Sequence, residues 1–237
     1  MSCTDCGRKG GCDSRKHVMF AAVDEALARL YPTACWGERN EAAAFENGIT
    51  ADEGRALADV IGAKVGALAY FRPGEPEEWC EYIYVLCLGR TPSIAQIRDG
   101  HGQPPGDEVE EDGLEGLEER YLRVALSSLA RFAGVQEVAM TLRRAGGDVV
   151  ITERARGGVF DPILLPRFQG LVAVLAAAEI RHLDFGEIIE APAGFDPATY
   201  PGRYGAEPAI ANYLFYPQPI TAVSTVVLPG SASASAC

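Results

Sequence analysis

Hydrophobic residues in the first part of the chain recur with the spacing of α-helices. The first set predicts a helix over about residues 15–31, which Asp13 or Ser14 can cap and which Pro32 ends. Its apolar positions are Met19, Ala22, Val23, Ala26, Leu27 and Leu30. A second helix is predicted to begin near Thr50, because Thr50 and Glu53 have the spacing of a capping box.

The hydrophobic pattern then changes to one that is typical of β-strands. Residues 65–71 and 79–88 predict two strands, joined by a loop that contains Pro and Gly. Residues 136–143 and 148–154 predict a second pair of strands, because the Gly-Gly pair between them suits a tight hairpin turn. Two such hairpins indicate antiparallel pairing.

Four further elements complete the expected fold. Residues 114–133 predict a helix whose acidic first turn suits the positive end of the helix dipole. Residues 162–178 predict another helix, in which Pro166 is tolerated in the first turn. Strands are expected at residues 180–189 and 221–228. Because these strands do not alternate regularly with helices, we expect an α+β fold, with packed helices on an antiparallel or mixed sheet.

The pattern divides the chain into three parts. Residues 1–35 form a Cys-rich loop and the first helix, and residues 36–230 form a single α+β domain. Residues 231–237 are small and polar, which is typical of a frayed tail. We therefore expect one folded domain preceded by a Cys-rich N-terminal loop.

Composition and charge exclude several classes of protein. The chain has 237 residues, of which 48% are hydrophobic, so it has enough apolar material for a core and is not disordered as a whole. It carries 33 acidic and 21 basic residues, a formal net charge of -12. Such an acidic chain repels nucleic acid and anionic membrane surfaces, so we expect no nucleic-acid partner.

The sequence carries no recognisable targeting or membrane segment. Residues 1–16 are polar and lack the apolar stretch of a signal peptide, and the longest apolar run, residues 171–178, is far too short to span a bilayer. We therefore expect a cytoplasmic protein without membrane insertion. Seven cysteines in a reducing compartment favour metal ligation and free thiols over a disulfide framework.

Three of these cysteines cluster near the N-terminus. Cys3, Cys6 and Cys12 give the spacing C-x2-C-x5-C within ten residues. The glycines between them, Gly7, Gly10 and Gly11, allow the backbone to turn so that the three sulfur atoms point to a common centre. The pattern predicts a metal site, although a flexible tail without a ligand remains the alternative.

Two residues compete for the fourth position of this site. Cys35 completes an all-cysteine set suited to an iron–sulfur cluster, for which we expect the 4Fe-4S type. His17 instead gives C-x2-C-x5-C-x4-H, which is close to a zinc knuckle. A helix over residues 15–31 is about 25 Å long, so Cys35 can reach the site only if that helix is shorter or the loop lies along it.

The charges around the cysteines favour a metal-bound thiolate site over an inert loop. Arg8, Lys9, Arg15 and Lys16 concentrate there in an otherwise acidic chain. Cys12 precedes the first helix, where free N–H groups stabilise anions. These features suit an iron–sulfur cluster slightly better than zinc, because a cluster with four thiolates carries more negative charge.

Other residues with chemical potential have simpler explanations. Cys80 and Cys87 are seven positions apart on one expected strand, so they point to opposite faces and act as small buried side chains. His182 and Asp184 share a strand face and could form an acid–base pair, but a solvated face is the more common arrangement. No nucleophile–base set and no nucleotide-binding motif is found, so we assign no catalytic residue.

These observations lead to one function and one alternative. We expect an iron–sulfur protein or subunit that supports electron transfer in a larger redox system, with a protein partner in that redox complex. The alternative is a non-catalytic accessory or interaction protein whose N-terminus is folded by zinc. The sequence does not reveal an enzymatic activity.

Overall fold

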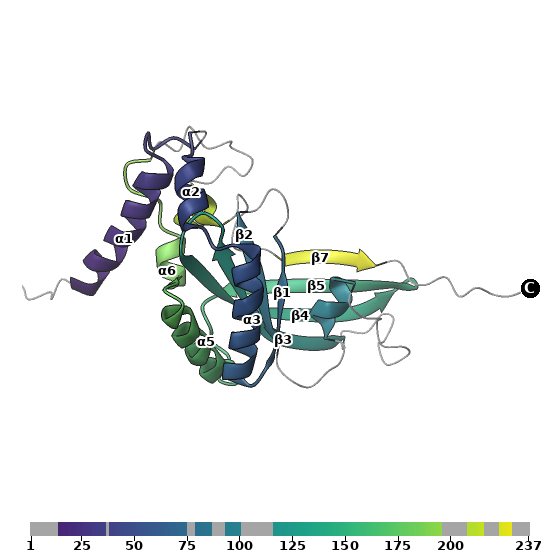
Figure 1. Cartoon of the computed structure of the whole chain (residues 1–237). Coiled ribbons are helices and arrows are strands. Elements are labelled where there is room, and N and C mark those ends of the chain that lie inside the picture. The colour runs from purple at the N-terminus through teal and green to yellow at the C-terminus, as the bar shows by residue number, and fades with distance from the viewer. Residues whose placement is uncertain are drawn as a thin grey trace, which may run out of the picture.

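The computed structural model is an α+β fold built on one seven-stranded sheet (Figure 1). The structure describes residues 14–36, 38–74, 79–86, 93–100, 116–195, 208–215 and 223–228. The strands are β1 (Leu68–Arg72), β2 (Cys80–Leu86), β3 (Leu117–Ser127), β4 (Phe132–Ala145), β5 (Asp148–Gly157), β6 (Arg181–Leu183) and β7 (Val223–Leu228). The helices are α1 (Ser14–Leu30), α2 (Glu41–Asn47), α3 (Ala51–Val65), α4 (Ile94–Arg98), α5 (Leu165–Ala177), α6 (Phe185–Ile188) and α7 (Ile210–Leu214).

The sheet has the order β1-β2-β3-β4-β5-β7, and every pair along this path is antiparallel. β6 stands off this path and pairs in parallel with the first residues of β4. The Cys-rich loop of residues 1–13 lies outside the described residues. Among the described helices, none is both long and apolar enough to cross a membrane.

Side chains alternate between two apolar layers, one on each face of the sheet. On one face, here called the α3 face, residues such as Ile83, Val124 and Val135 pack beneath α3 and α5, which lie side by side (Figure 1). On the opposite face, here called the α4 face, residues such as Tyr84 and Val138 pack with α1, α4 and α7. The strands are therefore covered on both sides over much of their length.

Several sequence predictions are confirmed. β1 and β2 pair in antiparallel fashion, as do β4 and β5. Gly146 and Gly147 form the two-residue turn of the second hairpin, with φ of 60° and 87°, which only glycine adopts readily. The side chain of Thr50 accepts a hydrogen bond from Glu53 N and so caps α3. α1 and α5 also occur where they were expected, with Pro166 in the first turn of α5.

The helix expected over residues 114–133 is wrong, because this segment contains β3. In β3, Tyr121 and Ala125 face the α4 layer, while Leu122 and Val124 face the α3 layer. A strand buried on both faces has no alternation of polar and apolar residues, so hydrophobic periodicity does not distinguish it from a buried helix.

The long strand expected over residues 180–189 is also wrong beyond its first part. β6 ends at Leu183, and α6 begins directly after Asp184. Asp184 and Glu187 form a capping box, with each side chain accepting a hydrogen bond from the other's backbone N–H. Their spacing is a helix-start signal that was present in the sequence and was overlooked.

Candidate functional site

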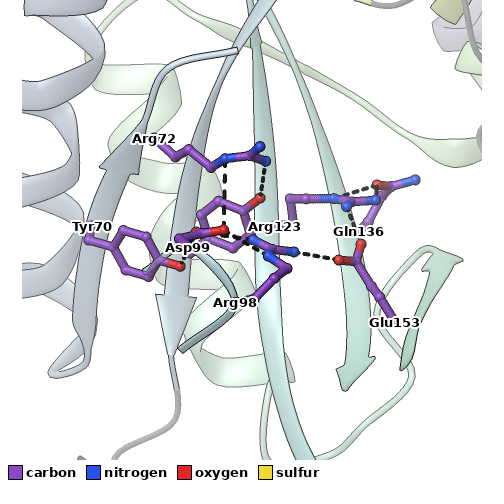
Figure 2. Close-up of polar contacts among 8 residues, drawn as sticks. Tyr70, Arg72, Arg98, Asp99, Arg123, Gln136 and Glu153 are labelled. Carbon is purple, nitrogen blue, oxygen red and sulfur yellow. Dashed lines mark hydrogen bonds and ion pairs between the residues drawn. The ribbon is translucent and has the colours of Figure 1, made fainter. Parts of the chain in front are cut away.

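The α4 face carries a cluster of charged and aromatic side chains, here called the arginine network (Figure 2). Its first four members lie in one row across four adjacent strands, because Tyr70 is paired with Tyr84, Tyr84 with Arg123, and Arg123 with Gln136. The alternation of side chains therefore brings these residues to the same face. The remaining members are Arg72 of β1, Glu153 of β5, Arg98 of α4 and Asp99, which caps the C-terminus of α4.

Helix α4 holds two members of the network over the sheet. Ser93 and Gln96 form a capping box at its start. The backbone N–H of Ile94 donates to the buried carboxylate of Glu119 on β3, with an N···O distance of 2.7 Å. Since both ends of this short helix are tied down, Arg98 is held against the sheet.

Arg98 lies at the centre of the arginine network. Its Nε and Nη2 atoms donate to the two carboxylate oxygens of Asp99 at 2.8 and 3.1 Å, and Nη1 donates to Glu153 Oε2 at 2.5 Å. The side chains of Arg98, Asp99 and Glu153 are only 10%, 8% and 7% exposed. Burial at this level requires each charge to have a partner, since an unpaired buried charge is very costly.

The other two guanidinium groups complete the network. Arg123 Nη1 donates to Glu153 Oε1, and its Nη2 and Nε donate to Gln136 Oε1 at 2.7 and 3.1 Å. Arg72 Nη1 donates to the Tyr84 hydroxyl at 3.3 Å. Two carboxylates, those of Asp99 and Glu153, thus connect three arginines into one continuous cluster.

Two tyrosines of this face, Tyr70 and Tyr121, are held in their neutral form. Burial raises the pKa of the Tyr70 hydroxyl, and the neighbouring Asp99, to which it donates at 2.9 Å, raises it further. Burial also raises the pKa of Tyr121, with an added contribution from Glu153. The Tyr121 hydroxyl has no hydrogen-bond partner among the described residues. Hydroxyl groups with such raised pKa values do not release protons at neutral pH, so neither Tyr70 nor Tyr121 supplies a general base.

A second feature of the α4 side is an aromatic cluster at the C-terminal end of α1. Tyr31 stacks on Trp36 and meets the edge of Tyr213, and its hydroxyl donates to the backbone oxygen of Tyr213 at 2.9 Å. Trp36 also contacts Trp79, over which the guanidinium of Arg39 lies at 4.5 Å. This cluster anchors the end of α1 to the domain.

The structure describes only part of the predicted metal site. Cys3, Cys6 and Cys12 lie outside the described residues. His17 lies at the start of α1, and its side chain is outside what the structure describes. Cys35 follows the C-terminal end of α1 and is half-buried beside the aromatic cluster.

The length of α1 bears directly on the choice of fourth ligand. α1 has 17 residues, so its two ends lie about 25 Å apart at 1.5 Å per residue. Cys12 stands two residues before α1, and two residues span at most about 7 Å. Cys35 follows the C-terminal end of α1, whereas Cys12 lies outside the described residues, so Cys35 as the fourth ligand stays a prediction.

In the described ranges, no group of three or more His, Cys, Asp or Glu side chains could hold a metal ion. Cys80 is buried in β2, as expected for a small core side chain, and Cys87 lies outside the described residues. The opposite orientation of these two cysteines therefore stays a prediction.

The acid–base pair of His182 and Asp184, the less common of the two arrangements considered from the sequence, is not formed, because β6 ends at Leu183. The carboxylate of Asp184 accepts from Glu187 N and caps α6. The ring of His182 meets the edge of Phe168 at a centroid distance of 5.3 Å. Burial lowers the pKa of His182, and the charge of Asp184 offsets this only in part. His182 is thus a neutral packing residue at pH 7.

One cavity of about 220 Å³ lies between α1, α2 and the connection from β3 to β4. Its floor is apolar, formed by residues such as Leu30, Leu129 and Phe132, and Arg29 and Arg131 also line it. Both arginines already have partners, since Arg29 pairs with Glu25 and Arg131 with Glu53. The cavity contains none of the predicted ligands.

Sequence reasoning missed both the arginine network and the cavity. One local signal was available, because the spacing of Ser93 and Gln96 indicates the start of α4. Comparison with protein-family models, with curated proteins and with solved structures gives no significant match.

Proposed function

We propose that this chain is a metal-binding accessory protein, in which Cys3, Cys6 and Cys12 hold an iron–sulfur cluster that supports electron transfer in a larger redox system. The observation that carries the proposal is the C-x2-C-x5-C spacing, with its interspersed glycines, directly before a helix. Thiolate ligands are stabilised by nearby cations and by the free N–H groups of a helix N-terminus, and both lie next to these cysteines in the sequence.

The way in which α1 is attached supports a peripheral metal centre. Val23, Leu27 and Leu30 of α1 are buried against the α4 face, so the second half of the helix belongs to the core. The N-terminal end of α1 projects away from the sheet (Figure 1). A metal bound just before this end would lie at the edge of the molecule, within reach of a partner protein. The iron–sulfur cluster would supply one-electron chemistry there, while the α+β domain holds the helix in place.

The length of α1 favours a second candidate, the zinc-stabilised accessory protein. His17 follows Cys12 by five residues and lies at the same end of α1, whereas Cys35 is about 25 Å away along the helix. A tetrahedral site made of Cys3, Cys6, Cys12 and His17 needs no long-range approach of the chain. An iron–sulfur cluster at this position would instead take its fourth ligand from His17 or from outside the chain.

Metal analysis of single variants of the full chain, purified without oxygen, tests both candidates, the iron–sulfur protein and the zinc-stabilised protein. Replacing Cys3, Cys6 or Cys12 with Ser should each remove most of the metal, because a hydroxyl is much harder to deprotonate than a thiol. Brown protein with bound iron and sulfide supports the cluster, and colourless protein with one bound zinc supports the second candidate. Cys237→Ser serves as the matched cysteine control and should keep the metal.

Two further variants identify the fourth ligand. His17→Ala should remove zinc if the local site forms, and Cys35→Ser should leave the metal in place if α1 separates Cys35 from the site. Loss of metal in Cys35→Ser alone would support the all-cysteine cluster and contradict the argument from helix length. Full metal retention in all three N-terminal cysteine variants would overturn the proposed function.

A further inference from the structure

Helices cover only part of the α3 face of the sheet. Helices α3 and α5 cover β1, β2 and the first part of β4, while the far ends of β4 and β5 leave side chains exposed on this face. The exposed residues alternate with buried residues such as Met140, Leu142 and Ile151, which point to the α4 face. They include Thr141, Arg143, Arg154 and Arg156.

Three arginines on this open area differ from the others in the molecule. The side chains of Arg143, Arg154 and Arg156 make no hydrogen bond or ion pair within the described part of the chain. Each other arginine whose side chain the structure describes has such an interaction or another specific contact. All three unpaired arginines therefore lie on one surface, which we call the open arginine surface.

The strand register places these side chains within reach of a single extended ligand. Arg154 and Arg156 are two residues apart on the same face of β5, about 7 Å at the strand rise. Arg143 lies opposite Val150, which is four residues before Arg154 in β5. Between them, Thr141 is paired with Thr152, and Thr152 with Thr225 of β7. The surface thus offers cationic groups with hydroxyl groups between them over about 20 Å.

Exposed apolar side chains border the same surface. The backbone N–H of Phe160 donates to Glu137 Oε2, and Glu137 is the register partner of Arg156. Phe160 and Ile163 are each 69% exposed. Arginine and aromatic residues together are enriched in the energetically important parts of protein interfaces. The apolar border gives the surface a second means of recognition besides charge.

We propose that the open arginine surface binds an acidic, extended segment of a partner protein, with carboxylates on Arg143, Arg154 and Arg156 and an apolar side chain against Phe160 and Ile163. Charge complementarity carries this choice, because unpaired arginines gather here on a chain whose net charge is -12. A single-stranded nucleic acid fits less well, since such ligands stack on several aromatic side chains, whereas Phe160 is the one aromatic residue named at this border. The inference does not depend on the N-terminal metal.

Binding of a labelled peptide to the full chain tests the proposal. The probe is a short synthetic peptide that alternates glutamate and leucine, followed by fluorescence anisotropy at low and high salt. The variant Arg143→Glu/Arg154→Glu/Arg156→Glu should weaken binding at least about tenfold, because it reverses the charges that meet the peptide. The Phe160→Ser variant should weaken binding without changing the salt dependence.

A second triple variant provides the matched control. Arg29→Glu/Arg55→Glu/Lys64→Glu changes the net charge by the same amount at exposed helical positions away from this surface. It should retain the affinity to within about threefold, since distant exposed charges are screened by salt. The single variant Arg154→Gln should weaken binding about threefold and gives a second measurement if the triple variant does not fold.

Four results would overturn the proposal. The first is an equal loss of affinity in the two triple variants, which would show an effect of net charge only. The second is the absence of binding between the acidic peptide and the wild-type chain. The third is tighter binding of a single-stranded oligothymidylate of the same charge, which would indicate a nucleic acid. The fourth is a concentration-dependent dimer that the Arg143/Arg154/Arg156 variant abolishes, which would identify a second copy of the chain as the occupant.

Discussion

Two groups of arginines lie on the same sheet but on opposite faces. On the α4 face, Arg98 and Arg123 are partly buried, with 10% and 19% of their side chains exposed, and share the carboxylate of Glu153. On the α3 face, Arg154 and Arg156 are exposed and have no partner in the described part of the chain. Burial accounts for the difference, because a buried guanidinium without a carboxylate would cost several kcal/mol, whereas water solvates an exposed one. Pairing on the α4 face therefore reflects folding, and the gathering of unpaired arginines on the α3 face needs another explanation.

The largest effect is expected from breaking the buried group. Arg98→Ala should lower the free energy of unfolding by about 3 kcal/mol, because it removes the guanidinium that two buried carboxylates share and leaves Glu153 with Arg123, and Asp99 with Tyr70 and the more distant Arg72. Chemical denaturation of the full chain measures this change. Arg154→Ala is the matched exposed control and should change the same quantity by less than about 0.5 kcal/mol. Equal losses in the two variants would contradict the distinction between the two faces.

Removing the hydroxyl group from either of two tyrosines on the α4 face should change the free energy of unfolding by different amounts. Tyr70→Phe should lower the free energy of unfolding by about 2 kcal/mol, because it removes a hydrogen bond to the buried carboxylate of Asp99. Tyr121→Phe should leave stability unchanged or raise it by up to about 1 kcal/mol, since the hydroxyl that it removes is buried without a partner. Denaturation curves of both variants test this pair, and a large loss in Tyr121→Phe would show that its hydroxyl has a partner.

The exposed group should matter for binding and hardly at all for stability. Replacing Arg143, Arg154 and Arg156 together with Gln should change the free energy of unfolding by less than about 0.5 kcal/mol per position, since each lies on the surface without a partner. Thermal and chemical denaturation should therefore give nearly superimposable curves for this variant and the wild type. A strong destabilisation would mean that these arginines hold the fold together.

The smallest expected effect concerns His182, which lies beneath α5 next to Phe168. Its pKa in the folded chain is lowered by burial from the ordinary value of 6.5, so the unfolded chain binds the proton more tightly. Stability is therefore full above pH 6.5 and falls as the pH drops below that value, until the folded-state pKa is passed. His182→Gln should reduce the slope of unfolding free energy against pH between pH 7 and 5. An unchanged slope would show that His182 does not contribute.

Helices and turns were predictable from the sequence where residues close together in the chain fix the backbone conformation. The Gly146-Gly147 turn was recognised because a two-residue hairpin needs positive φ at both positions. The start of α3 was recognised because the Thr50 side chain caps the helix only three residues away. β3 was misread because an apolar layer covers each of its two faces, so that its own apolar residues do not alternate with polar ones.

The sequence by itself determined the hairpins, the start of α3, the end of α1 and the spacing of the three N-terminal cysteines, because each depends on residues that are close together in the chain. Only the tertiary structure decided which arginines are paired. Arg98 meets Glu153, 55 residues later, because α4 packs against β4 beside β5, and no local pattern encodes that approach. The same tertiary arrangement leaves Arg154 and Arg156 outside the cover of α3 and α5. Contacts that are distant in sequence depend on how elements pack, and packing is a property of the whole chain.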